Sequence, residues 1–230
     1  MAHQSEQTLE NDLVAQLVAG GYSKVDLPDE TAMLANLRRQ LETHNAAKLG
    51  GVPLTDTEFK SVLNHLGRGT VFERAKTLRD KMHLVREDGS SVYLEFFNTS
   101  QWCQNEYQVA QQITNTGTYE TRYDVTILIN GLPLVQIELK RRGIELREAF
   151  NQINRYRRHS YSAGYGLFQY VQLFVISNGV DTKYYANTVS NNGDKKASYE
   201  FTYYWTDEQN VRMSELGQFA DIFLERCQLS

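Results

Sequence analysis

Apolar residues recur at helical spacing through most of the first 80 or so residues. Inside 5–19, leucine stands at every fourth position from Leu9 to Leu17, and Gly20 follows the run. This spacing predicts a helix with one buried stripe that ends at the glycine. Three more helices are expected: one capped by Asp29, one that begins with the capping box Thr55-x-x-Glu58, and one over 70–81.

From about residue 83 the pattern changes to short apolar runs that are typical of strands. Asp88-Gly89 separates two such runs, which predicts a hairpin. Helices on both sides of a central group of strands indicate an α/β layered domain. The other expected strands are 105–113, Tyr123–Ile129, Leu134–Lys140 and 171–177, with more sheet near 184–185 and 199–205, and helical spacing returns over 144–159 and 214–228.

The length of the chain suits this layout as one domain. Its 230 residues are enough to bury a sizeable core, and 41% of them are hydrophobic and 23% charged, as in an ordinary soluble globular protein. We expect one domain over 1–230, with a helix-rich part over about 1–82, a sheet core over about 83–205 and a helix at about 214–228.

Two strands joined at 130–131 carry the polar residues of interest. Glu138 and Lys140 of the second strand share one face, because side chains alternate along a strand. A plain two-residue hairpin loop would place Asp124 of the first strand opposite Ile137, with its carboxylate on the other face. Because a shift of one residue reverses this, we predict an odd loop or a compensating bulge that sets Asp124 opposite Glu138.

With that register, two carboxylates and an ammonium group would meet on one sheet face. Adjacent carboxylates repel each other, which favours the uptake of a proton or a cation. Mg²⁺ is commonly held by one or two carboxylates together with waters and phosphate oxygens, and it stabilises charge that develops on phosphate. Asp124, Glu138 and Lys140 are therefore candidates for phosphodiester hydrolysis. The simpler alternative is that Glu138 and Lys140 are solvent-facing residues of an amphipathic strand.

A basic stretch follows these residues. Residues 140–158 contain seven lysines and arginines against two glutamates, a local charge of +5, although the whole chain carries −4. The net charge excludes a uniformly basic nucleic-acid coat, but a local basic face beside the carboxylates suits a phosphate backbone. The alternative is a solvated helix face on which Glu148 pairs with nearby arginines.

Other chemistries find little support in the sequence. The five histidines do not stand at metal-ligand spacing with one another or with a cysteine, so no zinc site is expected. With only Cys103 and Cys227 a disulfide framework is excluded, and we expect reduced thiols that pack as small apolar groups. Because there is no apolar run of roughly 20 residues and no secretory signal, we expect a cytoplasmic protein without a membrane partner.

The order Asp124, then NGLPLVQIELK at 130–140, then Gln152-x-x-x-Tyr156 resembles the N-terminal endonuclease domain of the type I restriction enzyme R (HsdR-type) subunit. The Gln-Tyr pair is similar to a motif shared with RecB-like nucleases. The likeness extends from about residue 20 to 205, and 123–156 is its specific part. It implies the PD-(D/E)xK nuclease fold, a mixed β-sheet flanked by helices, here with an additional N-terminal helical region.

The resemblance implies roles for the residues at the strand pair. Asp124 and Glu138 would hold Mg²⁺, with Mn²⁺ as a substitute, and Lys140 would activate the attacking water. The proline in the formal motif name is replaced here by Tyr123, a position that varies in such nucleases. All three chemical positions have the residue type that the motif requires.

Roles for the flanking helices are implied in the same way. Gln152 and Tyr156 would help to position DNA or the catalytic groups. A glutamate of the first helix can join the metal site in this family, and Glu10 and Glu6 are candidates, the alternative being surface carboxylates of that helix. The DNA-binding residues expected from the basic stretch are Arg141, Arg142, Arg155, Arg157 and Arg158.

The R subunits of this family are large proteins in which ATP-driven motors follow the nuclease. This chain has no G-x-x-x-x-G-K-[ST] sequence, so we expect a fragment without the motor, and ATP would act only in the full-length subunit. The implied function is that of a type I site-specific deoxyribonuclease, which cuts double-stranded DNA while methyltransferase and specificity subunits recognise the sequence. The motor domains of the same subunit would be further partners. The isolated fragment would bind DNA weakly and cut it poorly.

The alternative from another functional class is a catalytically silent nuclease-like module for DNA binding or subunit docking. Convergence of Asp124, Glu138 and Lys140 distinguishes the two hypotheses.

Overall fold

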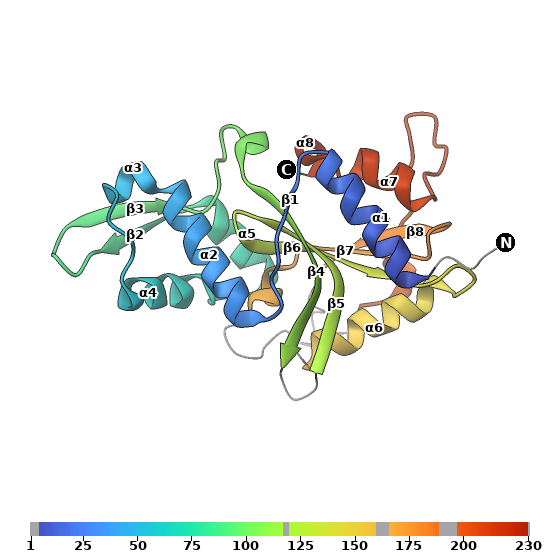
Figure 1. Ribbon diagram of the computed structural model, residues 1–230, viewed down its shortest axis with the longest axis horizontal. Coiled ribbons are helices and arrows are strands. Elements are labelled where there is room, and N and C mark those ends of the chain that lie inside the picture. Colours follow the sequence, from blue (N-terminus) through green and yellow to red (C-terminus); the bar gives the residue numbers. More distant parts are fainter. Residues whose placement is uncertain (1–4, 117–119, 160–165, 189–196, 230) are drawn as a thin grey trace.

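The computed structural model describes residues 5–116, 120–159, 166–188 and 197–229. Its centre is a six-stranded mixed sheet in the order β1-β4-β5-β6-β7-β8 (Figure 1). The pairs β1–β4 and β6–β7 are parallel and the other neighbours are antiparallel. The strands are β1 Ser23–Lys24, β4 Tyr107–Thr116, β5 Glu120–Ile129, β6 Leu132–Leu139, β7 Leu173–Ser177 and β8 Thr182–Ala186.

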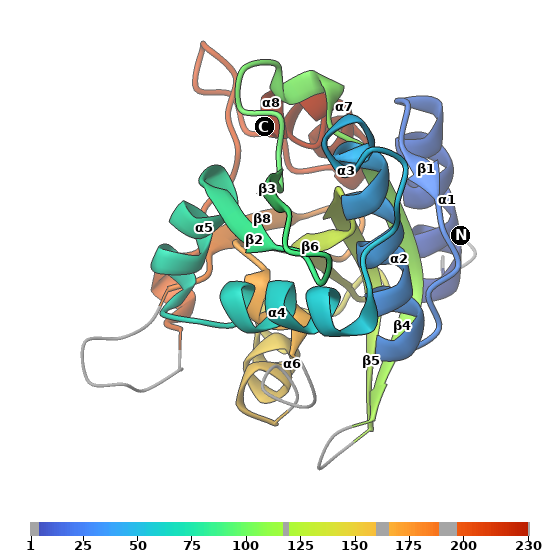
Figure 2. The same ribbon diagram turned by 90° about the vertical axis from the view of Figure 1, so that its left-hand side faces the viewer.

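Helices flank this sheet, and α1 and α7 lie side by side (Figure 1). A separate hairpin of β2 (Lys81–Val85) and β3 (Ser91–Glu95) packs with α3 and α4 at one end (Figure 2). The helices are α1 Glu6–Ala19, α2 Glu30–His44, α3 Ala46–Leu49, α4 Asp56–Leu66, α5 Val71–Arg79, α6 Leu146–His159, α7 Leu216–Phe223 and α8 Arg226–Leu229, and the 3₁₀ turns are η1 Trp102–Gln104, η2 Leu167–Tyr170 and η3 Tyr199–Phe201. The predicted class, a mixed α/β sheet with an additional N-terminal helical region, is confirmed.

The predicted helix starts are confirmed by their side-chain caps. Asp29 accepts a hydrogen bond from the backbone N–H of Ala32 at 2.8 Å. Thr55 and Glu58 form a reciprocal capping box at the start of α4. Such caps satisfy backbone N–H groups that have no partner inside the helix. No helix of the described ranges is long and apolar enough to cross a membrane.

The middle of the sheet is covered on both faces. Every residue from 123 to 129 in β5 is buried, including Asp124. In β6, Ile137, Glu138 and Leu139 are each 0% exposed. A strand that is buried on both sides cannot present a wet face. The interpretation of Glu138 as a solvent-facing residue of an amphipathic strand is therefore wrong.

The register between β5 and β6 is the one that brings Asp124 to the side of Glu138. The loop has two residues, with Ile129 paired to Leu132. Next to it a bulge shifts the ladder, because Leu134 has no partner and the following pairs run on to Val125–Ile137. The compensating bulge is confirmed, and the odd loop offered beside it does not occur. A bulge inserts one residue in one strand and reverses the facing of all that follow.

Two C-terminal predictions are wrong. Residues 199–205 do not form a strand: they begin with η3 and make one isolated bridge, Tyr184–Tyr203. Their aromatic rings pack onto β8 and α7 instead, where Trp205 lies edge-on to Phe223. The predicted helix over 214–228 is divided, since α7 ends at Phe223 and α8 starts at Arg226.

The expectation for the cysteines is also wrong. Cys103, which lies in η1, and Cys227, in α8, form a disulfide across 124 positions of sequence, and neither packs as a buried apolar group. The tertiary fold brings α8 against η1, a contact that spacing along the chain could not indicate.

The close approach of the Asn130-Gly131 turn to α2 can be tested. Gly131 has a φ of 83°, and a Cβ atom there would lie 2.8 Å from Cα of Leu37 in α2. Gly131→Ala should lower the free energy of unfolding by about 3 kcal/mol, because backbone strain adds to a clash with main chain that cannot move aside. Urea denaturation measures this.

The matched control is Gly143→Ala, since Gly143 has a φ of 92° and open space around its Cβ position. This variant should lower the free energy of unfolding by only about 1 kcal/mol, the contribution of backbone strain alone. Equal losses at the two positions would contradict the close approach of this turn to α2.

Candidate active site

Asp124, Glu138 and Lys140 converge where β6 leaves the sheet. Oδ2 of Asp124 accepts a hydrogen bond from the backbone N–H of Leu139 at 2.8 Å. Nζ of Lys140 donates to Oε1 of Glu138 and to the carbonyl of Leu139, both at 3.1 Å. The separation of the three side chains onto different faces, which would have ended the catalytic hypothesis, does not occur.

Burial sets the electrostatics of this cluster. It raises the pKa of Asp124, an effect that the N–H of Leu139 partly offsets. Burial, and then the charge of Asp124, raises the pKa of Glu138 well above its ordinary value. Burial acts to lower the pKa of Lys140, but the charges of Glu138 and Asp124 outweigh it and raise that pKa. Lys140 is therefore an ammonium group at neutral pH, and the two carboxylates are costly to ionise without a cation.

The carboxylates fit a divalent cation. Oε2 of Glu138 is buried and receives no hydrogen bond from an N–H or hydroxyl group of the described residues, and the carboxyls of Asp124 and Glu138 interact directly with each other. Such a buried pair must take up a proton or a cation, because two adjacent ionised carboxylates repel each other. The described ranges contain no group of three or more histidine, cysteine, aspartate or glutamate side chains that could hold a metal. Two adjacent carboxylates suit an ion such as Mg²⁺, which keeps waters and takes substrate oxygens.

Helix α1 brings two glutamates to this region. Oε1 of Glu6 accepts a hydrogen bond from the backbone N–H of Arg141 at 3.2 Å. Glu10 is only 3% exposed, so it is not a surface carboxylate. Burial raises its pKa, the hydrogen bond from Gln112 lowers it, and the charge of Asp124 raises it again. Glu10 therefore lies within electrostatic reach of Asp124.

The Gln-Tyr pair of α6 reaches the same cluster from the other side. Nε2 of Gln152 donates to the hydroxyl of Tyr156 at 2.6 Å. The ring of Tyr156 stands edge-on to that of Tyr123 at 5.2 Å. Burial and the charge of Glu138 raise the pKa of Tyr156 to about 12, so its hydroxyl keeps its proton. Tyr156 thus lies within electrostatic reach of Glu138, and Gln152 is joined to it by their hydrogen bond.

The predicted DNA-binding arginines divide into two groups. Arg141, Arg142 and Arg155 are exposed. Arg157 is only 4% exposed, donates to the carbonyl of Thr188 and lies over the ring of Phe174. Its assignment to the DNA surface is corrected, because its place on α6 faces the sheet. The side chain of Arg158 is outside the described part of the chain.

Sequence reasoning missed two residues near the cluster. Arg122 is exposed, stands two positions before Asp124 on the same face, and its charge acts on Glu10. Alternation along β5 could have found it. Gln112, which donates to Oε2 of Glu10, left no signal in the sequence, because its position depends on the β4–β5 register.

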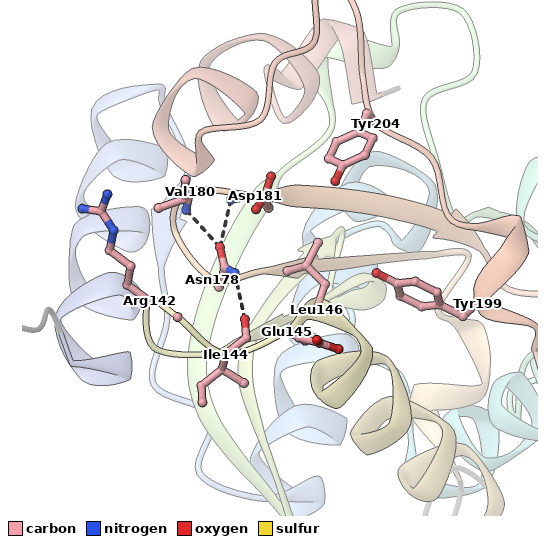
Figure 3. A pocket seen from close by; sticks show the side chains of 10 residues that line it. Arg142, Ile144, Glu145, Leu146, Asn178, Val180, Asp181, Tyr199 and Tyr204 are labelled. Atoms are coloured by element: carbon pink, nitrogen blue, oxygen red, sulfur yellow. Dashed lines mark hydrogen bonds between the residues drawn. The ribbon is translucent and has the colours of Figure 1, made fainter.

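A cleft of about 470 Å³ lies beside the chain that follows Lys140 (Figure 3). In one wall, Nδ2 of Asn178 donates to the carbonyl of Ile144 at 2.8 Å, which anchors the segment between β6 and α6. The carboxylates of Asp124 and Glu138 do not line this cleft, so it is a neighbour of the cluster and not its entrance. The polar lining residues are Arg142, Glu145, Asn178, Asp181, Tyr199 and Tyr204.

Comparison with known proteins agrees with this geometry. The family described as type I restriction enzyme R protein N terminus (HSDR_N) matches residues 3–193. The endonuclease subunit of type I restriction enzyme SauMSSORF170P from Staphylococcus aureus (strain MSSA476) is 50% identical over 230 residues, which are 100% of this chain and 24% of that subunit. The endonuclease subunit of EcoprrI from Escherichia coli is 40% identical over 231 residues, 98% of this chain and 71% of that subunit.

This chain belongs to the HSDR_N family. The resemblance inferred from 123–156 is thereby confirmed, and the match is to endonuclease subunits of type I restriction enzymes. The chain spans about a quarter of the length of the staphylococcal relatives that it matches. A more distant relative, the putative MjaVIIIP endonuclease subunit of Methanocaldococcus jannaschii, is 34% identical over 108 residues, 46% of this chain and 10% of that subunit.

The buried carboxylates of this HSDR_N chain predict a pH-dependent stability. An aspartate in the unfolded chain ionises near its ordinary value of 3.8, whereas folding raises the pKa of Asp124. Ionised Asp124 therefore opposes folding above that pH, and the cost disappears in acid, where both states bind the proton. Asp124→Asn should raise the melting temperature of the metal-free protein at pH 7, and this gain should shrink as the pH falls through the raised pKa of Asp124 and be largely gone below about 4.

The exposed Asp26→Asn serves as the control and should leave the melting temperature unchanged at both pH values. A gain for Asp124→Asn that is the same at pH 7 and pH 3.5 would show that it does not arise from ionisation.

Proposed function

We propose that this chain is the Mg²⁺-dependent endonuclease domain of a type I restriction enzyme. It would hydrolyse phosphodiester bonds in double-stranded DNA without sequence specificity of its own. The observation that carries the proposal is the cluster of Asp124, Glu138 and Lys140, in which the two buried carboxyls interact directly and Lys140 donates to Glu138. Two adjacent carboxylates suit a divalent ion that also takes phosphate oxygens, and a charged lysine beside them suits a phosphate substrate.

In this proposal Asp124 and Glu138 hold the ion, and Mn²⁺ can replace Mg²⁺. Bound there, the ion supplies positive charge to the scissile phosphate and lowers the pKa of a bound water. Lys140 keeps its proton, so it acts as a donor that orients the attacking water and offsets phosphate charge. Tyr156 accepts a hydrogen bond from Gln152 and also keeps its proton, so it is a further hydrogen-bond donor within electrostatic reach of Glu138.

DNA would be held through its backbone. Arg141 and Arg142 follow Lys140 directly, and Arg155 lies on the exposed side of α6. Contacts from such arginines to phosphate position a duplex but do not read its sequence. Sequence recognition is therefore assigned to methyltransferase and specificity subunits. ATP-dependent translocation is assigned to motor domains of the full-length subunit, which would work in the cytoplasm.

Loss of the cluster should abolish cleavage. With supercoiled plasmid, Mg²⁺ or Mn²⁺ and protein in excess, Asp124→Asn, Glu138→Gln and Lys140→Met should each cut at least about 100-fold more slowly than the unchanged chain, because each removes charge stabilisation of the transition state. Lys81→Met, at a lysine of β2 that is 61% exposed, is the control and should cut normally.

DNA binding measured beside cleavage separates the alternatives. Full DNA affinity with no cleavage by the unchanged chain in either metal would favour a silent binding module. Cleavage that survives all three changes would refute the assigned site.

The salt dependence of DNA affinity can distinguish the exposed arginines from the buried Arg157. Each phosphate contact contributes about 0.9 to the slope of log K against log salt concentration. The triple variant Arg141→Ala, Arg142→Ala, Arg155→Ala should reduce this slope by about 3 without a large change in melting temperature. Fluorescence anisotropy with a short duplex measures it.

Arg157→Ala is the contrasting variant. It should keep the slope but lower the stability of the fold by about 2 kcal/mol, because it leaves a gap beside Phe174 and a carbonyl without its donor. A changed slope with unchanged stability would return Arg157 to the DNA surface.

A further inference from the structure

Three cations and two tyrosine rings alternate beside the cleft of Figure 3. The guanidinium of Arg147 lies 4.8 Å from the centre of the Tyr199 ring, and Nζ of Lys183 lies over the same ring at 4.9 Å. Nζ of Lys183 also lies over the Tyr204 ring at 4.8 Å, and the guanidinium of Arg212 is 4.8 Å from the centre of that ring. We call these five residues the cation–tyrosine ladder, which has Arg147 at one end and Arg212 at the other.

The fold fixes the cations of this ladder from three directions. Arg147 lies in the first turn of α6. Lys183 is a residue of β8, and its Nζ donates to the hydroxyl of Thr202 at 3.2 Å. Arg212 stands in a short turn that is closed by its bridge to Thr206. Side chains that are already ordered on a ring lose less freedom when they bind a ligand, so binding costs less.

The charges of the ladder are not neutralised by neighbouring carboxylates. Among the described residues, none of its three cations forms an ion pair. Burial, and then the charge of Arg212, lowers the pKa of Lys183, and the charge of Asp181 offsets this only in part. Arg147 and Arg212 are both exposed. Like charges held together in this way attract an anion, and a guanidinium can bind phosphate through two parallel hydrogen bonds.

The two sides of the ladder differ in charge. Its tyrosines turn their hydroxyl ends into the cleft, where the carboxylates of Glu145 and Asp181 also lie (Figure 3). Arg147 and Arg212 do not line this cleft. A phosphate is therefore repelled from the cleft and attracted to the exposed arginine ends of the ladder.

The ladder begins close to the proposed catalytic cluster. Arg147 follows Lys140 by seven positions. Seven residues span at most about 25 Å even when they are fully extended. One turn of a DNA duplex covers roughly 34 Å. The distance from Lys140 to Arg147 is thus less than one turn of duplex, so DNA held at the cluster can extend to the ladder.

We propose that Arg147 and Arg212 hold backbone phosphates of the duplex that flanks the cut, and that the rings of Tyr199 and Tyr204 position the two guanidinium groups. The inference rests on the proposed nuclease function, because it takes DNA as the ligand. The contacts are additional to those of the arginines assigned to DNA above. They position the duplex and do not read its sequence.

The first test is the salt dependence of duplex affinity, measured by fluorescence anisotropy on the 230-residue chain without a divalent ion, so that no DNA is cut. Arg147→Gln combined with Arg212→Gln should reduce the slope of log K against log salt concentration by about 2, because each phosphate contact contributes about 0.9. Arg147→Lys combined with Arg212→Lys keeps both charges and should keep the slope. An unchanged slope in the glutamine variant, or no duplex affinity of the unchanged chain at low salt, would overturn the proposal.

Lys60→Gln combined with Arg68→Gln is the matched control, because it removes two positive charges as well. Both residues are exposed, Lys60 on α4 and Arg68 just after it, at the end of the molecule that carries the β2–β3 hairpin. This control should keep the slope. An equal reduction in both double variants would show that total charge governs binding, and the ladder would then have no special role.

The part played by the rings is tested at Tyr204. Tyr204→Leu removes the ring under Arg212 but no charge, so duplex affinity at a fixed salt concentration should fall about fivefold, because the arginine must then be ordered on binding. Tyr204→Phe keeps the ring and should bind DNA normally. Equal affinities of the leucine and phenylalanine variants would refute the positioning role.

Inorganic phosphate distinguishes a DNA contact from a site for a small anion. Calorimetric titration of the unchanged chain with phosphate should show no more binding than titration with chloride. Clear binding of phosphate, together with a duplex slope that does not depend on Arg147 and Arg212, would assign the ladder to a small anion and overturn the proposal.

Failure of the nuclease hypothesis would be visible separately. If Asp124→Asn, which leaves the ladder intact, cuts plasmid as fast as the unchanged chain does, the assigned catalytic site is wrong. The salt slopes are measured without cleavage, so they still decide whether the ladder holds DNA.

Discussion

One unpaired residue in β6 determines which side chains of the strand pair share a face. The bulge at Leu134 shifts the pairing of β5 and β6 by one residue, and only with that shift do the side chains of Asp124 and Glu138 share a face. The hairpin loop alone, with Ile129 paired to Leu132, would send Asp124 to the other side of the sheet. The N–H of Leu139 that binds Asp124 is available at that position for the same reason.

The cluster that results is expensive for the fold. Two carboxylates lie in a sheet that is covered on both faces, and their raised pKa values measure the cost of ionising them there. Lys140 and the N–H of Leu139 offset part of this cost, but one oxygen of Glu138 receives no hydrogen bond from an N–H or hydroxyl group of the described residues. Stability given up at such a site is typical of groups that are arranged to receive a ligand.

Segments far apart in the chain complete the surroundings. Helix α1 contributes Glu6 and Glu10 from more than 100 positions before the strand pair, and β4 contributes Gln112 across from Asp124. Helix α6 brings Tyr156 within electrostatic reach of Glu138. The sheet therefore serves as a rigid frame on which side chains from α1, the strands and α6 meet. Rigid elements of this kind hold the side chains of a site in fixed positions.

Local structure and the candidate site residues could be predicted from the chain alone. The helix caps at Asp29 and Thr55 depend on neighbours only a few residues away, so they can be predicted from the sequence. The same holds for the alternation around 130–131 and for the order of Asp124, Glu138 and Lys140. The same alternation predicted either a bulge or an odd loop but could not choose between them. Only the tertiary structure decided which arginines are exposed, that Cys103 meets Cys227, and that Gln112 holds Glu10. These depend on contacts between segments separated by tens to hundreds of residues, and no periodicity or spacing in the sequence encodes which buried face such a segment will meet.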